Sequence, residues 1–251
     1  MNLIRCIKAD LYKLKHTSIV WIHLIIPILG AMAFLLYYSN SSWEAISKFS
    51  GYFEAIAIAF PLIIGLVSSM VIEQEEQGDF KELITSTTWR GTALISKLIL
   101  LIIGGTVSII IALAIFAVGF QCVLKQGTLP IKCYVQVGAS LLLGNIFLYI
   151  IHTYLSLQLG KGASIGLGII GSLISTIMIT GLGDRVWRFI PWSWGVRLCD
   201  YRILKEIDIS TYSLCAGEIK LGLINIISST IAVIAIILFW FASWEGRKVV
   251  E

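Results

Sequence analysis

Residues 55–80 read AIAIAFPLIIGLVSSMVIEQEEQGDF, and this stretch decides the fold. Eighteen residues without a formal charge, from Ala55 to Ile72, run directly into a cluster of carboxylates. An apolar run of that length crosses the hydrocarbon core of a bilayer as a helix, and its abrupt charged end marks where the chain enters water. The sequence therefore predicts a transmembrane helix that ends in an acidic segment.

The rest of the chain repeats this alternation of long uncharged stretches and narrow charged bands. The 251 residues are 57% hydrophobic and only 14% charged, whereas about a quarter of an ordinary soluble domain is charged. Six stretches lack Asp, Glu, Lys and Arg, at 17–43, 55–72, 98–124, 133–160, 162–183 and 221–244. Because strand-like alternation is absent, helices must satisfy the backbone in lipid. We expect an all-α membrane protein with six transmembrane helices in a single domain, 1–251.

Residues 1–16 precede the first span and have a pattern of their own. Their apolar residues share one helical face, at Leu3, Ile7, Leu11 and Leu14. This spacing predicts an amphipathic helix on the inner membrane surface, with its cations near anionic headgroups. A soluble helix docked on a partner is the alternative. We interpret the span that follows as an uncleaved anchor and not as a signal peptide.

Lysine and arginine in the loops indicate the orientation. With a cytoplasmic N-terminus, the inner side carries ten of these cations, Lys97, Lys161 and Lys248 among them, and the outer side carries nine. Six of the nine fall in the long segment 184–220, and without it the ratio is ten to three. We therefore expect a multi-pass protein of the cell membrane with both termini in the cytoplasm. The net charge of +4 follows from this topology and indicates no nucleic-acid partner.

Segment 73–97 is the strongest functional signal. We expect a cytoplasmic coupling loop in which carboxylates surround two apolar side chains at i, i+3 and dock into a cleft of a partner. A solvated acidic loop is the alternative. The residues assigned to coupling are Glu73, Glu75, Glu76, Gly78, Asp79, Phe80 and Leu83.

The fourth and fifth spans carry further patterns. A polar stripe, formed by Asn145, Tyr149, His152 and Ser156, runs along one face of the fourth span. Polar groups at membrane depth face protein or water, so the stripe either bonds helices together or lines a substrate path. The fifth span has small residues suited to close helix packing, within the chain or against a partner, at Gly162, Gly166, Gly168 and Ser172.

Segment 184–220 is too long for a simple connection between the last two spans. Its aromatic and basic residues suggest short helices that dip into the outer headgroup layer. The residues assigned to this outer site are Asp184, Arg185, Trp187, Arg188, Trp192 and Trp194. Nearby cysteines leave two alternatives open: bridges Cys122–Cys133 and Cys199–Cys215, or unpaired thiols.

Catalytic motifs are absent from the sequence. The nearest match to a phosphate-binding loop, GKGAS at 160–164, has Gly where Ser or Thr must follow the lysine. No nucleophile elbow, zinc-protease helix or metal-ligand spacing occurs. We expect no enzyme activity, no ATP and no other cofactor or metal in this chain.

Several strings identify a family resemblance: WIHLIIPILG at 21–30, AIAFPLIIG at 57–65, GKGASIGLG at 160–168, GLGD at 181–184, FIPW at 189–192 and WEGR at 244–247. With six spans, the interfacial helix and the acidic segment, the chain resembles ABC-2 type exporter permeases. More narrowly, it resembles the G-type permease subunits of lantibiotic self-immunity transporters, such as those for mutacin, epidermin and nisin.

The resemblance implies an assembly with a related E-type permease and an ABC ATPase subunit, which would hold ATP and Mg²⁺. That assembly would confer immunity or resistance by expelling cationic antimicrobial peptides from the membrane. Two alternatives remain at this stage. The chain could serve an ABC-2 exporter of another amphiphile, such as a lipid or a bacitracin-like antibiotic, or it could be a non-transporting membrane scaffold or sensor.

Overall fold

The computed structural model describes residues 2–15, 17–85, 89–127 and 129–247. Lys248, one of the cations used for the orientation, lies outside the described residues, as do residues 86–88 of the expected coupling loop. The helices are α1 (Leu3–Leu14), α2 (Ser18–Ser39), α3 (Ala45–Glu76), α4 (Lys81–Thr85), α5 (Gly91–Val118), α6 (Ile131–Gln158), α7 (Lys161–Ile179), α8 (Pro191–Ile207) and α9 (Ile209–Ser243). A π-helical turn, Gly119–Val123, extends α5, and two short 3₁₀ turns precede α8 at Gly181–Gly183 and Trp187–Phe189.

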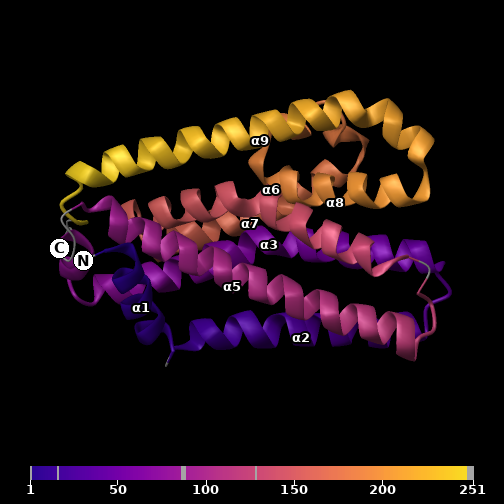
Figure 1. Cartoon of the computed structure of the whole chain (residues 1–251), viewed down its shortest axis with the longest axis horizontal. Coiled ribbons are helices and arrows are strands. Elements are labelled where there is room, and N and C mark those ends of the chain that lie inside the picture. The colour runs from indigo at the N-terminus through magenta and orange to yellow at the C-terminus, as the bar shows by residue number, and fades with distance from the viewer. Residues whose placement is uncertain (1, 16, 86–88, 128, 248–251) are drawn as a thin grey trace.

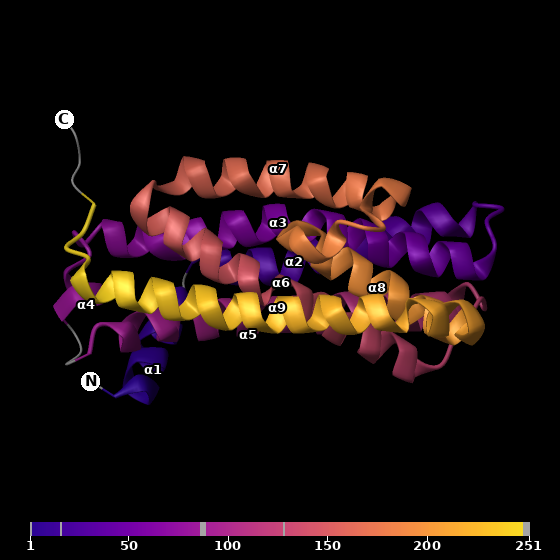
Figure 2. The same ribbon diagram turned by 90° about the horizontal axis from the view of Figure 1, so that it is seen from above.

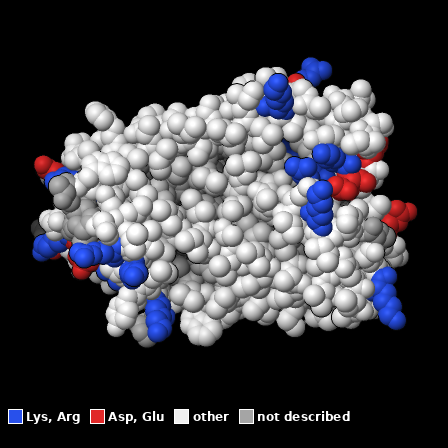
Figure 3. Space-filling view, viewed as in Figure 1, with Lys and Arg blue, Asp and Glu red and all other residues white. Residues whose placement is uncertain are grey.

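Six of these helices are long and apolar enough to cross a membrane: α2, α3, α5 with its π turn, α6, α7 and α9. They run side by side along the long axis of the molecule (Figure 1). Charged side chains gather toward the two ends of that axis and leave an uncharged band between them on the face seen in Figure 3. The described residues contain no β-strand, so the predicted all-α membrane fold is confirmed.

Both chain ends lie at one end of the bundle, which we name the termini end; the opposite end is the far end (Figure 1). α1 lies across the termini end, where it packs against α5. The Asn2 side chain caps α1 by accepting a hydrogen bond from the backbone N–H of Arg5 at 3.1 Å, which satisfies one of the free donors of the first turn.

The helices extend beyond the uncharged stretches that predicted them. α3 continues through Glu76, and α5 begins at Gly91, so the expected loop 73–97 is mostly helical. α3 also begins ten residues before Ala55, at Ala45, and contains Lys48. The reason is that the loss of apolar residues marks where a helix leaves lipid, whereas Glu, Gln and Lys continue a helix readily in water.

The segment between α7 and α8 turns back along the bundle (Figure 2), with Leu182 and Phe189 still exposed. From there α8 runs outward again to the far end, packed against α6 and α9. Trp187 and Trp194 are buried, with 0% and 1% of their surface exposed. This differs from the expected position in the headgroup layer, because burying two indoles between α6, α8 and α9 removes a large apolar area from solvent.

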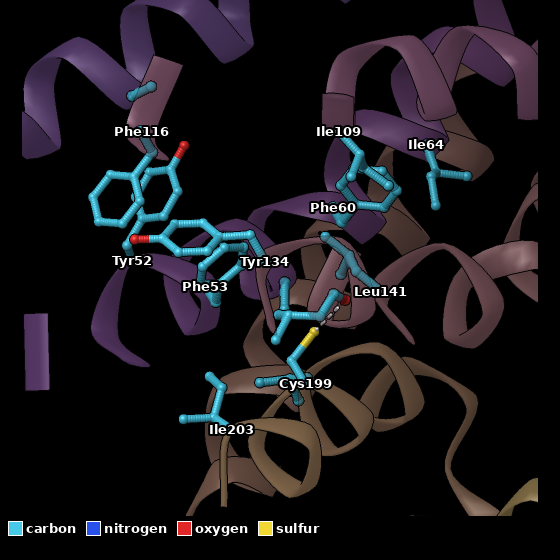
Figure 4. Packing of buried hydrophobic residues seen from close by; sticks show 14 of the residues in the cluster. Tyr52, Phe53, Phe60, Ile64, Ile109, Phe116, Tyr134, Leu141, Cys199 and Ile203 are labelled. Carbon is cyan, nitrogen blue, oxygen red and sulfur yellow. Dashed lines mark hydrogen bonds between the residues drawn. The ribbon is translucent and has the colours of Figure 1, made fainter. Parts of the chain in front are cut away.

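An aromatic cluster joins α3, α5 and α6 in the far half of the bundle (Figure 4). The rings of Tyr52 and Phe116 stack with centroids 3.7 Å apart. The Tyr52 hydroxyl donates to the Ala112 carbonyl at 3.0 Å, so the ring is buried without an unpaired polar group. Tyr134 packs edge-on against Phe49 at 4.8 Å. This cluster fixes the far half of three spanning helices relative to one another.

Lys48 is a charged residue that the sequence placed in an outer loop and the structure buries. Only 1% of its surface is exposed. Its ammonium donates to the Tyr38 carbonyl at 3.1 Å and to Gln126 Oε1 at 3.0 Å. These bonds tie the end of α2 and the loop after α5 to the start of α3.

Candidate functional site

The last turn of α3 is the centre of an ion-pair network at the termini end. Glu75 Oε1 lies 2.7 Å from Lys97 Nζ of α5 and 2.8 Å from Lys13 Nζ of α1. Glu75 and Lys97 are each only 4% exposed. One buried carboxylate of α3 therefore holds both α1 and α5.

The network continues through Lys97 into α1. Asp10 accepts a hydrogen bond from Lys97 Nζ at 2.5 Å and another from the Ser96 hydroxyl at 2.5 Å. Asp10 is also buried, at 8% exposure. Removing one member of such a buried set leaves a charge without compensation, which costs several kcal/mol. The amphipathic helix is thus fixed to the bundle by charge as well as by apolar contact.

Lys13 links this buried set to the surface. Its ammonium pairs with Glu75 and also with Glu82 of α4. Partial burial works to lower the pKa of Lys13, but hydrogen bonds to these two carboxylates outweigh it and raise the pKa above its ordinary value. Lys13 therefore stays charged at physiological pH and connects α4 to α1 and α3.

The neighbouring carboxylates of α3 each pair with a different part of the chain. Glu73 binds Lys161 at the start of α7, at 2.8 Å, and Glu76 pairs with Arg247 after α9. Gly160, which precedes α7, has φ of +88°, and a Cβ there would collide with the Arg247 guanidinium. The positive φ favours glycine at this turn, and a larger residue would also have to displace the Arg247 guanidinium.

The turn between α3 and α4 is the part of the acidic segment that faces solvent. Its exposed residues, which we name the exposed turn, are Gln77, Gly78, Asp79, Lys81 and Glu82. Asp79 and Phe80 have positive φ, at 52° and 56°, a strained conformation for a side chain as large as phenylalanine. A backbone bond from the Phe80 N–H to the Glu75 carbonyl, at 2.9 Å, closes the turn.

Phe80 and Leu83 do not present apolar surface to a partner, contrary to expectation. They are 4% and 1% exposed, and the Phe80 ring packs edge-on against Trp244 with centroids 5.1 Å apart. Arg90 donates to the Trp244 carbonyl at 2.9 Å. The two apolar side chains stay inside because α9 returns to the termini end and covers them, which the local sequence does not reveal.

The polar stripe of α6 is buried and mostly bonded within the protein. Asn145 donates to the Leu141 carbonyl at 2.7 Å, and Ser156 to the His152 carbonyl at 2.7 Å. His152 Nδ1 lies 3.1 Å from the Ser164 hydroxyl of α7, which itself donates to the Gly65 carbonyl of α3 at 2.9 Å. These contacts hold α3, α6 and α7 together.

Tyr149 is the member of the stripe that lines a cavity. The cavity has a volume of about 150 Å³ and lies among α2, α3, α5 and α6, with Pro27 and Phe60 in its walls. Pro27 has no N–H, so the His23 carbonyl loses its helical donor; the Ser108 hydroxyl of α5 replaces it at 2.9 Å. The sequence shows the proline but not which helix supplies the replacement donor.

The expected outer site is divided by the structure. Arg185 and Asp184 are exposed, although Asp184 pairs with Arg197 at 2.8 Å. Arg188 pairs with Glu218 of α9 at 3.3 Å. Trp187 and Trp194 are buried, and Trp192 is half-buried. Of the six assigned residues, only Asp184 and Arg185 are exposed to a ligand outside the protein.

The small residues of α7 face two ways. Gly168 packs on α3, where a Cβ would lie 2.9 Å from the Pro61 carbonyl oxygen. A Cβ on Gly162 or Gly166 would meet no atom within 4 Å. Ser172 is half-buried. Among the described residues, no other element packs closely on the Gly162–Gly166 pair.

Cysteine and metal chemistry add nothing to the site. All five cysteines, Cys6, Cys122, Cys133, Cys199 and Cys215, are free thiols. Within the described ranges, no group of three or more His, Cys, Asp and Glu side chains could hold a metal ion.

The bundle geometry agrees with a comparison against protein families. Residues 6–178 match the model of the family described as ABC-2 family transporter protein. The chain belongs to this family. The match covers α2, α3, α5, α6 and nearly all of α7, and so includes every charged pair around Glu75. No curated protein and no solved structure matches the chain. As an ABC-2 permease, the chain is a membrane subunit of an ABC transporter.

Proposed function

We propose that this ABC-2 permease couples ATP hydrolysis in a separate ATPase subunit to the export of a cationic amphiphilic peptide. The observation that carries the proposal is the arrangement around the last turn of α3. Its three carboxylates, Glu73, Glu75 and Glu76, pair with cations from α7, from α1 and α5, and from the segment after α9. A displacement of the exposed turn is thereby passed to four other parts of the chain at once.

The exposed turn is the surface that the ATPase subunit would contact. It combines solvent-facing Asp79, Lys81 and Glu82 with a strained backbone at Asp79 and Phe80. Such strain is typical of segments with a mechanical or binding role. ATP and Mg²⁺ would be held by the partner, and the turn would follow its closure. In this proposal the termini end of the bundle faces the cytoplasm.

The substrate class is proposed from the resemblance to G-type lantibiotic immunity permeases. The peptide can shift the permease from one conformation to another only if it binds one of the two conformations better. Tyr149 in the cavity wall and the exposed residues Asp184 and Arg185 would meet the peptide at different stages. A second, E-type permease would complete the path, with the open face of α7 around Gly162 and Gly166 as its contact.

Two experiments test this proposal. Charge reversal at Asp79 and Glu82 should abolish co-purification of the ATPase subunit. It should also abolish the resistance of the cells to the exported peptide, while the permease remains in the membrane. If both survive, the exposed turn is not the coupling surface, and a scaffold or sensor role replaces transport.

Killing curves with a nisin-like peptide and with bacitracin, in cells with and without the whole complex, identify the substrate class. We expect the complex to protect against the lantibiotic. Protection against bacitracin alone would assign the transporter to another amphiphile, and unchanged sensitivity to both would remove antibiotic export.

A further inference from the structure

An open groove at the termini end has the shape and charge of a lipid site. It has a volume of about 460 Å³ and lies among α1, α2 and α5. It forms because α1 crosses α5 at this end of the bundle (Figure 1). Its walls are almost wholly apolar, with Leu14, Val20, Leu24, Leu101 and Val107 among the lining residues.

Gly104 of α5 and His23 of α2 lie side by side in the wall of this groove. A Cβ at Gly104 would lie 2.7 Å from Nε2 of His23, another lining residue. A side chain at position 104 would therefore have to displace the His23 imidazole. The lining residues run from Ile19 to Leu24 on α2 and from Leu100 to Val107 on α5, so the groove extends along the spanning helices, which suits a hydrocarbon chain lying parallel to them.

The groove carries one cation, Lys15. The nearby Lys13 is neutralised by Glu75 and Glu82, but Lys15 forms no ion pair within the described part of the chain. It is exposed and caps the C-terminal end of α1. An uncompensated ammonium beside a long apolar groove complements a ligand with one negative group above a hydrocarbon chain.

A second groove of similar size provides the contrast. It has a volume of about 410 Å³ on α5 and α6, and its lining includes Ile110, Ala114 and Val135 but no lysine, arginine or histidine. Hydrocarbon chains of any surrounding lipid can fill such a surface. If both grooves held lipid only by apolar contact, neither would distinguish between headgroups.

We propose that the α1–α2–α5 groove binds one anionic phospholipid from the leaflet that borders α1. The phosphate lies at Lys15, and an acyl chain follows Leu14 and Leu24 toward Gly104. The bound lipid braces α1 against α2. Because α1 also carries Asp10 and Lys13 of the ion-pair network, the lipid stabilises the same arrangement that holds the end of α3. This inference does not depend on the identity of the exported substrate.

Native mass spectrometry of the purified full-length chain with phosphatidylglycerol or phosphatidylcholine tests the proposal. One lysine beside an anionic headgroup contributes about a fivefold gain in affinity. We expect Lys15→Gln to weaken phosphatidylglycerol binding about fivefold and to leave phosphatidylcholine binding unchanged. Val20→Trp, which fills the groove, should remove the selective phosphatidylglycerol site.

Two matched variants serve as controls. Lys8→Gln removes an exposed cation of α1 that lines neither groove, and Ala114→Trp fills the second groove; both should retain selective binding. Equal losses in Lys15→Gln and Lys8→Gln would show a diffuse charge effect and overturn the proposal. Equal affinity of the parent protein for the two lipids would also overturn it. If Val20→Trp fails to fold, the two lysine variants still decide the outcome.

Discussion

Both ends of the bundle have a buried apolar cluster, but they differ in their charged contacts. At the termini end, α1, α3, α5 and α7 are joined by ion pairs around Glu73, Glu75 and Glu76. At the far end, the aromatic cluster and the hydrogen bonds of Lys48 join α2, α3, α5 and α6. Close-packed rings tolerate little displacement, whereas the partly exposed pairs Glu73–Lys161 and Glu76–Arg247 can exchange partners with water. The difference indicates a rigid far end and a termini end whose outer ion pairs can rearrange around the buried Glu75–Lys97 pair.

The far end should show the largest loss of stability on mutation. Phe116 is fully buried and stacks on Tyr52, so Phe116→Ala should cost about 3–5 kcal/mol. Thermal unfolding of the purified protein measures the change. Phe239, which is 85% exposed to the lipid side, is the control: Phe239→Ala should leave the melting temperature nearly unchanged. Equal effects of the two variants would contradict a packed far end.

The ion-pair network should show the next largest effect. Lys97→Gln leaves Asp10 and Glu75 buried with less positive charge, which we expect to destabilise the protein by about 3 kcal/mol. Adding Asp10→Asn should restore part of that loss, because it removes one uncompensated carboxylate. Thermal unfolding of the single and double variants measures both steps. Additive losses in the double variant would show that the two residues act independently.

The two faces of α7 should respond differently to the same substitution. Gly168→Leu inserts a side chain against the Pro61 carbonyl and should destabilise the chain by about 1–3 kcal/mol. A Cβ at Gly166 meets no atom within 4 Å, so Gly166→Leu should leave unfolding of the isolated chain nearly unchanged while it weakens assembly with a second permease. Co-purification of the two permeases measures the assembly. Intact assembly in Gly166→Leu would assign the partner contact to another helix.

The smallest effect is expected at the cap of α9. Asp208 accepts hydrogen bonds from the N–H groups of Ser210 and Thr211. Hydrogen bonds from the side chains and backbone of these residues lower the pKa of Asp208 to about 2. The lowered value means that the cap stabilises α9 above about pH 4, the ordinary pKa of aspartate, and that this contribution is lost as pH falls toward 2.

Melting temperatures of the parent protein and of Asp208→Ala between pH 5 and pH 2 test this dependence. At pH 5 the parent should melt at a slightly higher temperature than Asp208→Ala. This difference in melting temperature should shrink at pH 2. A difference that stays constant over this range would show that the charge of Asp208 plays no part.

The sequence predicted the spanning helices well because the membrane imposes a strong apolar pattern on them. It could not predict where each helix ends, since Glu73–Glu76 and Ala45–Glu54 are helical outside the apolar run. It also placed Lys48 and Trp187 at the surface, because burial of a lysine or an indole depends on partners distant in sequence. The sequence marks Asp10 as the one carboxylate of residues 1–16. Only the structure shows that Asp10 pairs with Lys97 of α5.

Chemical labelling of Asp79→Cys in otherwise cysteine-free protein tests the central claim most directly. An impermeant thiol reagent applied to intact cells should leave position 79 unmodified but modify Leu214→Cys, an 85% exposed position on α9 near the far end. In inside-out vesicles the reagent should modify position 79, and the ATPase subunit should slow that reaction. Rapid modification of position 79 from outside, or no protection by the ATPase, would contradict the account.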